Sequence, residues 1–573
     1  TGNILCQEVI DLPPDIYIHE FQKKLLTVYK SIVVNAVKKL INGNRGTVQP
    51  SLDLPYFGKI KDEDMVIHVN TPIDRAYGMI RAFSFPYQGA RFENIRIMKV
   101  KIIKDKYLHD VKDLNIEFFK QRKNIHLDYN RLKEIEKKYT FFKGLNNQIL
   151  SSQMTSTPYH DRYFYPKSTY EENCYWLLLN YNKTEELLNS IEPDYIFDIG
   201  TEEIQRTIIN EVANYKKIPY ISIESTRYET FIIPTFNLGL QLDQYFMKAY
   251  ESNKNQINSL HEYIDEVKNY RAKTHILSDK FQDLMDYSHS FTLRDMLKYI
   301  LIKTYRYALS GVQDFIKKKK YMHFNSPIDG NSFKKILWHY NYAFRKFLLN
   351  LNMSSFFKAP AKEKYAFMPL HLIPESTTFV KAPMYVNELN NIQAVAKSLP
   401  IDWKLYVKEH PAMIGERNLN FYRNVNKIPN VKLVTSNYYE DPKTWIENSA
   451  VVITIAGTSA FEATMLNIPA MVFGNVSYNV LSNIKLVKSF NELESLFNLI
   501  ESNSWLKDNT IECAAYLKTI SEVGVNLDYN QLIKLASKKI HSEPLEKQEK
   551  EDFVVLLNCL INFFEKAVSI KKQ

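Results

Sequence analysis

The sequence has few of the residues on which several classes of protein depend. Its 573 residues include only four cysteines, at Cys6, Cys174, Cys513 and Cys559, and their spacing fits neither a metal site nor a redox pair. We therefore expect free thiols in a reducing, cytoplasmic compartment. The sequence contains no zinc motif, P-loop or Gly-x-Ser-x-Gly elbow, so we expect no metal and no cofactor. It also lacks a signal peptide and a run of about 20 apolar residues, which argues against a membrane span.

Charge and composition place the chain among globular proteins. Hydrophobic residues make up 45% and charged residues 24% of the sequence, which suits three or four domains with ample cores. The net charge of +10 includes the basic run Lys317–Lys320, which follows a mixed apolar and basic stretch at Leu297–Phe315. This stretch fits a peripheral helix on anionic lipid, or a core helix with a solvated end. In the tail, Asn558 and Asn562 interrupt an apolar helix predicted at Phe553–Ser569. No nucleic-acid-binding module accompanies the charge, so no nucleic-acid partner is expected.

Three motifs between residues 365 and 478 follow apolar runs of strand length. The runs are Tyr365–Met368, Trp403–Val407 and Val451–Ile455. The motifs are Pro-Leu-His-Leu-Ile-Pro-Glu-Ser-Thr at 369–377, Val-Lys-Glu-His-Pro at 407–411 and Gly-Thr-Ser-Ala-Phe-Glu-Ala at 457–463. Ligands of parallel α/β sheets lie outside the carboxyl ends of the strands. We therefore predict that the three motifs share one nucleotide site.

The third motif suits a phosphate-bearing ligand. Gly457 permits a close backbone turn after its strand. Thr458 and Ser459 bring hydroxyl and N–H groups to the start of a helix predicted at Ser459–Leu466, where phosphate is favoured. Glu462 can complete a capping box with Ser459 or accept hydrogen bonds from ribose hydroxyls. The structural alternative is an ordinary capped helix.

The second motif offers a neutral or charged donor to the same ligand. His410 can donate to a phosphate oxygen from a loop that Pro411 stiffens. The structural alternative is a surface histidine. Lys408 of the same motif, with Glu375 and Ser376 of the first motif, completes the candidate nucleotide site.

Residues 176–240 predict a β-α-β unit that precedes this domain. A helix at 176–187 leads to the strand Tyr195–Asp198, a helix at about 202–215 and the strand Tyr220–Ile223. Acidic side chains at strand ends can act as general bases. The candidates at these strand ends are Asp198, Glu202, Glu203 and Glu224. The sequence does not choose among them, and ordinary first-turn helix acids are the alternative.

The segment Tyr365–Leu481 resembles the C-terminal half of the capsule polysaccharide biosynthesis proteins. The resemblance is carried by PLHLIPESTTF, LYVKEHPAMIGERNLNFYRN and VVITIAGTSAFEATMLNIPAMVFG. These proteins are similar to GT-B glycosyltransferases that use CMP-activated sugars such as Kdo or sialic acid, and akin to transferases that use CDP-glycerol. The resemblance implies an inverting, metal-independent GT-B enzyme across about 176–481. It also implies that His410, Thr458 and Ser459 hold the donor's phosphates.

A second resemblance covers the N-terminal region. The residues predict a strand at Ile4–Ile10, helices at about 18–42 and 72–83, and a strand at Ile95–Ile103, with no catalytic constellation. TGNILCQEVIDL and IRAFSFPYQGA resemble the later part of the folate-dependent formyltransferases. That family's catalytic Asn, His and Asp and its folate pocket lie upstream of the matched region. The resemblance therefore implies a truncated formyltransferase end that binds no folate and transfers no formyl group.

The expected fold class is α/β, a GT-B-like pair of Rossmann-like domains with helical insertions and a small formyltransferase-type remnant. The expected domains are the remnant at 1–103, a helical connector at 104–175, an acceptor-side Rossmann-like domain at 176–350, a nucleotide-sugar-binding Rossmann-like domain at 351–541 and a C-terminal helix at 542–573.

The expected function is transfer of a sugar from a CMP- or CDP-activated donor to a glycan or lipid-linked acceptor in capsule or surface polysaccharide synthesis. The location expected is the cytoplasm, with peripheral contact at the inner membrane. The alternatives are a non-catalytic polysaccharide-binding or export-coupled protein, and a formyltransferase-derived fusion.

Overall fold

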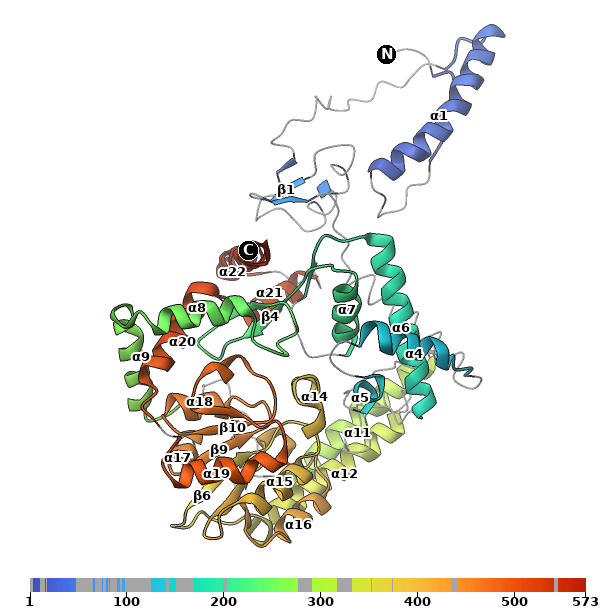
Figure 1. Ribbon diagram of the computed structural model, residues 1–573. Helices are drawn as coiled ribbons and strands as arrows, with labels where there is room; N and C mark the ends of the chain where they lie inside the picture. Colours follow the sequence, from blue (N-terminus) through green and yellow to red (C-terminus); the bar gives the residue numbers. More distant parts are fainter. Residues whose placement is uncertain are drawn as a thin grey trace. The chain divides into compact units, whose positions relative to one another are not determined.

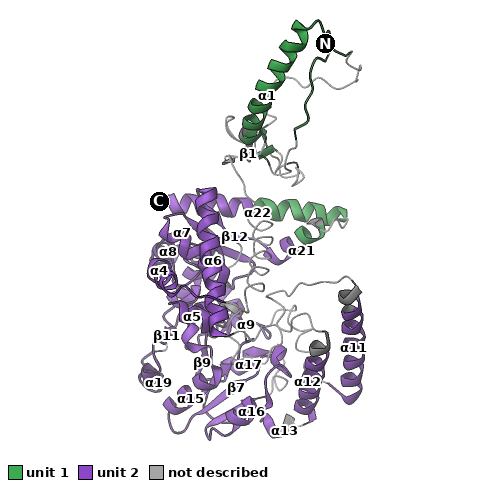
Figure 2. Cartoon of the chain, turned by 90° about the vertical axis from the view of Figure 1, so that its right-hand side faces the viewer, with its two compact units in different colours: residues 1–108, 535–558 green, residues 109–534, 559–573 purple. Residues whose placement is uncertain are grey.

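The chain divides into two compact units, residues 1–108 with 535–558 and residues 109–534 with 559–573 (Figure 2). The computed structural model describes residues 4–10, 16, 18–47, 65–66, 75, 79–80, 82, 90–92, 95–97, 125–140, 144–150, 169–198, 204–276, 291–316, 332–351, 353–373, 375–434, 441–505, 507–540 and 545–572.

A six-stranded sheet forms the centre of the larger unit (Figure 1). Its strands are β6 (Tyr365–Pro369), β7 (Lys404–Lys408), β8 (Val431–Val434), β9 (Val451–Thr454), β10 (Ala470–Val472) and β11 (Ile484–Leu486). The spatial order is β11-β10-β9-β6-β7-β8, and every neighbouring pair is parallel. This is the doubly wound order of a Rossmann fold, and it reverses between β6 and β9. The three strands predicted from apolar runs are confirmed to within about a residue.

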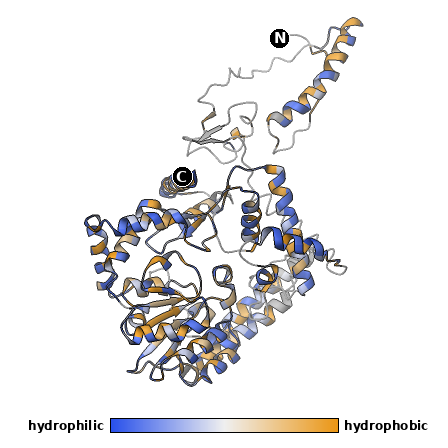
Figure 3. Ribbon diagram, in the orientation of Figure 1, coloured by the Kyte–Doolittle hydropathy of each residue, from blue (hydrophilic) through white to orange (hydrophobic). Residues whose placement is uncertain are grey.

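The strands of this sheet are apolar because helices cover both faces. Alternate residues of one strand face opposite cores: Phe367 packs in the cluster that contains Trp445, and its neighbour Met368 packs in the cluster that contains Trp403. The covering helices are α15 (Glu388–Ser398), α16 (Leu419–Asn426), α17 (Pro442–Glu447), α18 (Ser459–Met465), α19 (Leu493–Glu501) and α20 (Thr510–Val523). Figure 3 shows the hydrophobic colour gathered on the strands that these helices enclose.

A smaller, mixed sheet is built from three strands that precede the large sheet in the chain and one that follows it. Its strands are β3 (Ile196–Phe197), β4 (Tyr220–Ser225), β5 (Phe231–Thr235) and β12 (Val525–Asn526), in the order β12-β5-β4-β3. β3 and β4 are parallel and joined through α7 (Ile204–Tyr215), which confirms the predicted β-α-β unit. β4–β5 is antiparallel, since the short turn after β4 leaves no room for a crossover helix, and β5–β12 is antiparallel as well. Beyond this one unit, a second Rossmann-like domain remains a prediction.

Further helices surround the two sheets. α4 (Tyr129–Tyr139), α5 (Leu145–Leu150) and α6 (Tyr170–Ile191) share a core with α7, while α8 (Gln244–Lys254) and α9 (His261–Ala272) pack on α20. α11 (Leu293–Ile316) and α12 (Ser332–Leu351) pack on each other, which confirms a helical insertion before β6. Shorter elements are η2 (Ile257–Ser259), α13 (Met353–Phe356), α14 (Ser376–Lys381), η3 (Pro383–Tyr385), η4 (Pro411–Met413), η5 (Ser477–Val480), η6 (Phe490–Glu492) and α21 (Tyr529–Ile540).

The smaller unit confirms only part of the N-terminal prediction. The helix predicted at about 18–42 is α1 (Ile18–Ile41), but the strand predicted at Ile4–Ile10 is reduced to a single bridge between Ile4 and Thr47. β1 (Ala90–Phe92) and β2 (Ile95–Ile97) form an antiparallel pair, so β2 confirms the start of the strand predicted there. Residues 98–103 and most of the helix predicted at 72–83 lie outside the described residues. The formyltransferase remnant remains a prediction.

The C-terminal helix α22 (Lys547–Lys572) corrects one inference from the sequence. It is long and apolar enough to cross a membrane by length and composition, although the sequence argued against such a segment. The two asparagines do not lower its mean hydropathy far enough. The C-terminal half of α22 nevertheless packs against β3 and the residue that precedes β12. The Phe564 ring lies 4.4 Å from that of Phe197, and Lys566 Nζ donates to the Gly524 carbonyl at 3.0 Å.

Candidate functional site

The three motifs meet at the point where the strand order reverses. β6 pairs with β7 on one side and with β9 on the other, so the segments that follow these strands leave the same edge of the sheet side by side. His371, two residues after β6, makes the closest link. Its Nε2 lies 3.0 Å from Thr454 Oγ1 at the end of β9, and it accepts a hydrogen bond from the Ala456 N–H at 3.4 Å.

The turn after β9 has no space for a side chain at Gly457. A Cβ there would lie 2.6 Å from Thr454 Oγ1 and 3.1 Å from His371 Nε2. The Gly457 N–H donates to Thr454 Oγ1 at 3.2 Å, and its carbonyl accepts from the Tyr478 hydroxyl at 2.7 Å. The turn is therefore held on both sides, and glycine is required by the close approach rather than by an unusual dihedral angle.

The hydroxyl residues after this turn lie at the surface. Thr458 occupies the cap position of α18 and Ser459 is its first residue, and both are partly exposed. The expected capping box between Ser459 and Glu462 is therefore absent, because the helix begins at Ser459 itself. α18 has only seven residues, so its dipole is short. The hydroxyl groups, rather than the helix end alone, are what this segment presents to a ligand.

His410 is a neutral imidazole whose Nε2 faces outward from a fixed loop. Its Nδ1 accepts a hydrogen bond from the Ala412 N–H at 3.2 Å and caps η4, whose first residue is Pro411. Burial lowers the pKa of His410 to about 4, and the nearby positive charge of Arg417 acts in the same direction. Since Nδ1 is an acceptor, the proton of the neutral ring resides on Nε2. The ring can therefore donate one hydrogen bond to an anion at neutral pH.

Lys408 of the second motif and Glu462 of the third motif form a pair of titratable groups. Burial lowers the pKa of Lys408 to about 8, against the opposing charges of Glu462 and Asp441. Burial also raises the pKa of Glu462 to about 7, and the Lys408 charge opposes this shift. Each group therefore limits the other's shift, and both change charge near neutral pH.

A buried ionic network lies beneath the first two motifs. Arg417 pairs with Glu388 through Nη2 at 2.5 Å and with Glu409 through Nε at 2.7 Å. Burial raises the pKa of Glu409. Burial also acts to raise the pKa of Glu388, but the charge of Arg417 and the hydrogen bonds from His371 together outweigh it and lower that pKa below its usual value. Glu409 also accepts from the His410 N–H at 2.7 Å and from the Tyr422 hydroxyl at 2.8 Å. Its carboxylate is therefore fully engaged inside the domain and points away from any ligand.

The sequence did not single out His371, Glu388 or Arg417. His371 stands in the first motif, so its position after a predicted strand could have identified it. Arg417 and Glu388 carry no local signal, because their partners come from separate segments of the chain.

The candidate bases are held in different ways. Asp198 pairs with Arg206 Nε at 3.0 Å and accepts from the Tyr220 hydroxyl. Glu224, at the end of β4, forms an ion pair of 2.7 Å with Lys381 at the end of α14, and their side chains are 10% and 5% exposed. Glu202 and Glu203 lie outside the described residues. Both described carboxylates are thus already partnered.

Of the two, Glu224 lies closer to the turn at Gly457. Burial raises the pKa of Tyr478, whose hydroxyl binds that turn, and the charges of Glu224 and Glu462 raise it further while Arg227 opposes them. Among the donor-side residues, Glu375 is partly exposed and its Oε2 lies 3.5 Å from Thr378 Oγ1, while Ser376 begins α14.

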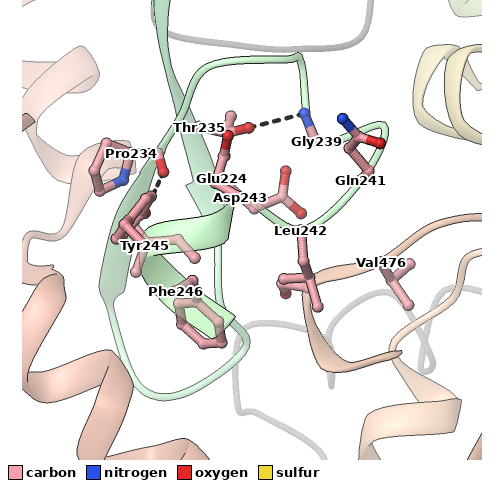
Figure 4. A pocket seen from close by; sticks show the side chains of 12 residues that line it. Glu224, Pro234, Thr235, Gly239, Gln241, Leu242, Asp243, Tyr245, Phe246 and Val476 are labelled. Carbon is pink, nitrogen blue, oxygen red and sulfur yellow. Dashed lines mark hydrogen bonds between the residues drawn. The ribbon is translucent and has the colours of Figure 1, made fainter. Parts of the chain in front are cut away.

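A cavity of about 20 Å³ adjoins Glu224 (Figure 4). Asp243 lines it, and burial raises the pKa of this carboxyl to about 6. The Gly239 N–H donates to Thr235 Oγ1 at 3.1 Å beside it. Such a volume holds roughly one water molecule, which is too little for a sugar. Its lining includes Val476 and Ser477, so it lies between the segment after β10 and the loop that joins β5 to α8.

Comparison with known proteins leaves the family open. No family model matches the chain, and no curated protein matches it. Solved structures that resemble it include the β-Kdo 2,7-transferase of Thermosulfurimonas dismutans KpsC (10% identity, 59% of this chain and 80% of that chain, TM-score 0.30). The β-Kdo 2,4-transferase of the same KpsC (12%, 56% and 79%, TM-score 0.23) and Neisseria meningitidis UDP-GlcNAc 2-epimerase (15%, 62% and 82%, TM-score 0.24) are also similar. These TM-scores are too low to carry an argument.

Proposed function

We propose that this chain is a glycosyltransferase that uses a CMP- or CDP-activated sugar in capsule or surface polysaccharide synthesis. The observation that carries the proposal is the convergence of three motifs at the switch point of a doubly wound sheet. The resemblance of Tyr365–Leu481 to capsule polysaccharide biosynthesis proteins supports the same reading. No group of three or more His, Cys, Asp or Glu side chains that could hold a metal occurs among the described residues.

In this proposal the donor's phosphates are held by neutral groups. His410 donates from Nε2, and the hydroxyls of Thr458 and Ser459 reach the same anion from the turn after β9. Lys408, in the same motif as His410, supplies positive charge when protonated. Glu462 and the segment Glu375–Ser376 complete the site on the ribose and sugar sides. The transition state of transfer gains charge on the leaving phosphate, which pre-organised donors of this kind stabilise.

The proposed base is an acidic residue of the preceding β-α-β region. Glu224 is the strongest candidate because its charge acts on Tyr478, which binds the Gly457 turn. To accept a proton, Glu224 has to exchange its partner Lys381 for the acceptor hydroxyl. Asp198, Glu202 and Glu203 remain the alternative bases. Inversion at the anomeric carbon follows if the base and the donor phosphate lie on opposite faces of the sugar.

Nucleotide binding is the first test of this proposal. CMP, CDP and UDP are titrated separately into the intact chain, with melting temperature and calorimetric affinity as readouts. We expect stabilisation by a cytidine nucleotide, and the His410→Asn variant to weaken it. If none of the three nucleotides binds, the donor site is wrong. If one binds but its sugar derivatives are never transferred to any glycan or lipid-linked acceptor, the non-catalytic alternative replaces the enzyme.

Peripheral membrane contact is the second part of the proposal. α11 exposes large apolar side chains along one stripe, beside Arg294, Lys298 and Arg306. Those more than half exposed are Leu293, Leu297, Leu301, Ile302, Tyr305 and Val312. This pattern suits insertion at an anionic lipid surface, where a lipid-linked acceptor resides.

Vesicles test the lipid contact. The intact protein is sedimented with phosphatidylcholine vesicles that contain or lack phosphatidylglycerol. Binding that requires phosphatidylglycerol and is lost in the Leu301→Ser/Tyr305→Ser variant supports the proposal. If the variant binds as well as the unmodified protein, the lipid contact is made by another segment such as α22. If the unmodified protein does not bind either kind of vesicle, the proposed membrane contact is wrong.

A further inference from the structure

His371 of the first motif contacts the segment that leads from β9 into the third motif. Its ring is 8% exposed, and its Nε2 touches both Thr454 Oγ1 and the Ala456 N–H. The Gly457 N–H binds the same Thr454 oxygen. The imidazole therefore fills the space directly behind the turn, in the position that a Cβ at Gly457 would need.

The hydrogen bond from Ala456 determines which ring nitrogen of His371 carries the proton. An N–H can only donate, so the bond from Ala456 makes Nε2 an acceptor and puts the proton of the neutral ring on Nδ1. Nδ1 lies 3.5 Å from Glu388 Oε1, which also accepts from the His371 N–H at 2.7 Å. Arg417 Nη2 donates to the His371 carbonyl at 2.9 Å and pairs with the same Glu388. The residue is thus fixed through its backbone N–H, its backbone carbonyl and its ring.

We propose that His371 is a positioning residue that sets the Gly457–Ser459 turn for the donor's phosphates, acting through Nε2 on Thr454 and the Ala456 N–H. This inference rests on the proposed nucleotide site and adds a residue to it. His371 does not touch the ligand. It fixes the backbone from which Thr458 and Ser459 project, and Glu388 and Arg417 fix His371 in turn.

Two substitutions at His371 separate positioning from packing. Gln places an acceptor near the site of Nε2 and keeps the bond to Ala456, whereas Leu fills the volume without any acceptor. Thr454→Val removes the hydroxyl on the other side of the same contact. Thr519→Val is the matched control, because Thr519 is also a buried threonine whose hydroxyl is hydrogen-bonded, in α20 away from the motifs.

The experiment measures two quantities in each folded variant: affinity for whichever of CMP, CDP and UDP binds the unmodified protein most tightly, and hydrogen exchange of the Ala456 and Gly457 amides without nucleotide. We expect His371→Leu to weaken binding roughly tenfold and to speed exchange at both amides, because the Ala456 N–H loses its acceptor and the Thr454 hydroxyl, to which the Gly457 N–H donates, loses the contact that orients it. His371→Gln should restore both readouts to within about threefold of the unmodified protein. Thr519→Val should change neither.

The outcomes separate this inference from the nucleotide site itself. Faster exchange with unchanged affinity, or failure of Gln to restore either readout, overturns the positioning role while leaving the donor site in place. Unchanged exchange in a folded His371→Leu variant overturns it as well. If the unmodified protein binds none of the nucleotides, the proposed function fails and the positioning role for a phosphate ligand falls with it. Non-additive effects of His371→Leu and Thr454→Val on affinity support one shared contact.

Discussion

Replacing His410 tests the donor site most directly, and the structure divides the effect into two parts. The ring caps η4 through Nδ1 and offers Nε2 to the donor. His410→Asn keeps a side-chain acceptor near Nδ1 and loses the distal donor. His410→Gln keeps a distal donor and loses the cap. The two variants therefore separate ligand binding from stability, which His410→Ala would change together.

The magnitudes follow from the two bonds. A hydrogen bond to a charged phosphate is worth about 1.5–3 kcal/mol, so His410→Asn should weaken nucleotide binding roughly tenfold to a hundredfold. Loss of a cap destabilises a protein by about 1 kcal/mol, so His410→Gln should lower the melting temperature by a few degrees with little change in affinity. A loop histidine alone would predict no change in stability, and the cap is the reason to expect one.

The assay is calorimetric titration with the best nucleotide, combined with thermal melts between pH 4 and pH 8. The folded-state pKa of His410 is about 4, below its usual value of 6.5. The unfolded chain therefore takes up the proton first, and the contribution of His410 to stability is present above pH 6.5 and lost as the pH falls towards 4. His410→Asn should flatten this part of the profile. Normal affinity and turnover in a folded His410→Asn variant would refute the donor role.

Three further substitutions test the rest of the site. Gly457→Ala should destabilise the protein by about 1–3 kcal/mol and weaken nucleotide binding, because the new Cβ meets Thr454 and His371. Gly144→Ala is its control, because a Cβ there meets only the end of the Glu136 side chain. Equal melting temperatures of the two variants would contradict the close packing at Gly457. Glu224→Gln should abolish transfer and destabilise by about 3–5 kcal/mol, since Lys381 is left buried and unpaired. Adding Lys381→Met should restore stability in melts without restoring transfer, and recovered transfer would exclude Glu224 as the base. Glu462→Gln should become progressively more stable than the unmodified protein as the pH rises from about 4.5 to about 7, because the pKa of Glu462 is raised in the folded state and the unmodified protein loses stability over this range. Parallel pH profiles of the two proteins would exclude this shift.

The sequence identified the doubly wound sheet because its strands are buried on both faces. Such strands appear as uninterrupted apolar runs, and the motifs after Met368, Val407 and Ile455 then lie at one edge by the geometry of parallel sheets. The same reasoning placed His410 and Gly457 in one region. It could not give the tautomer of His410, which depends on the single hydrogen bond from Ala412.

The elements that the sequence missed depend on contacts between distant segments. Glu224 and Lys381 are separated by 157 positions, and neither has a local pattern that identifies the other. β12 has two residues and pairs with β5 from the far end of the chain, so no run of apolar residues marks it. The mixed sheet consequently looked, from its β-α-β unit alone, like the start of a parallel one.

In the proposed site, the residues assigned to the donor are held by more contacts than those assigned to the acceptor. Arg417, Glu388 and Glu409 hold the backbone of the first two motifs, so His410 and the Gly457 turn need little rearrangement to meet a phosphate. The nearest candidate base, in contrast, is paired with a lysine and adjoins a space for about one water molecule.

Lys381 ends the short helix α14, which begins at Ser376 in the first motif. A ligand bound at the start of α14 would therefore contact the same short helix that ends at Lys381, the ion-pair partner of Glu224.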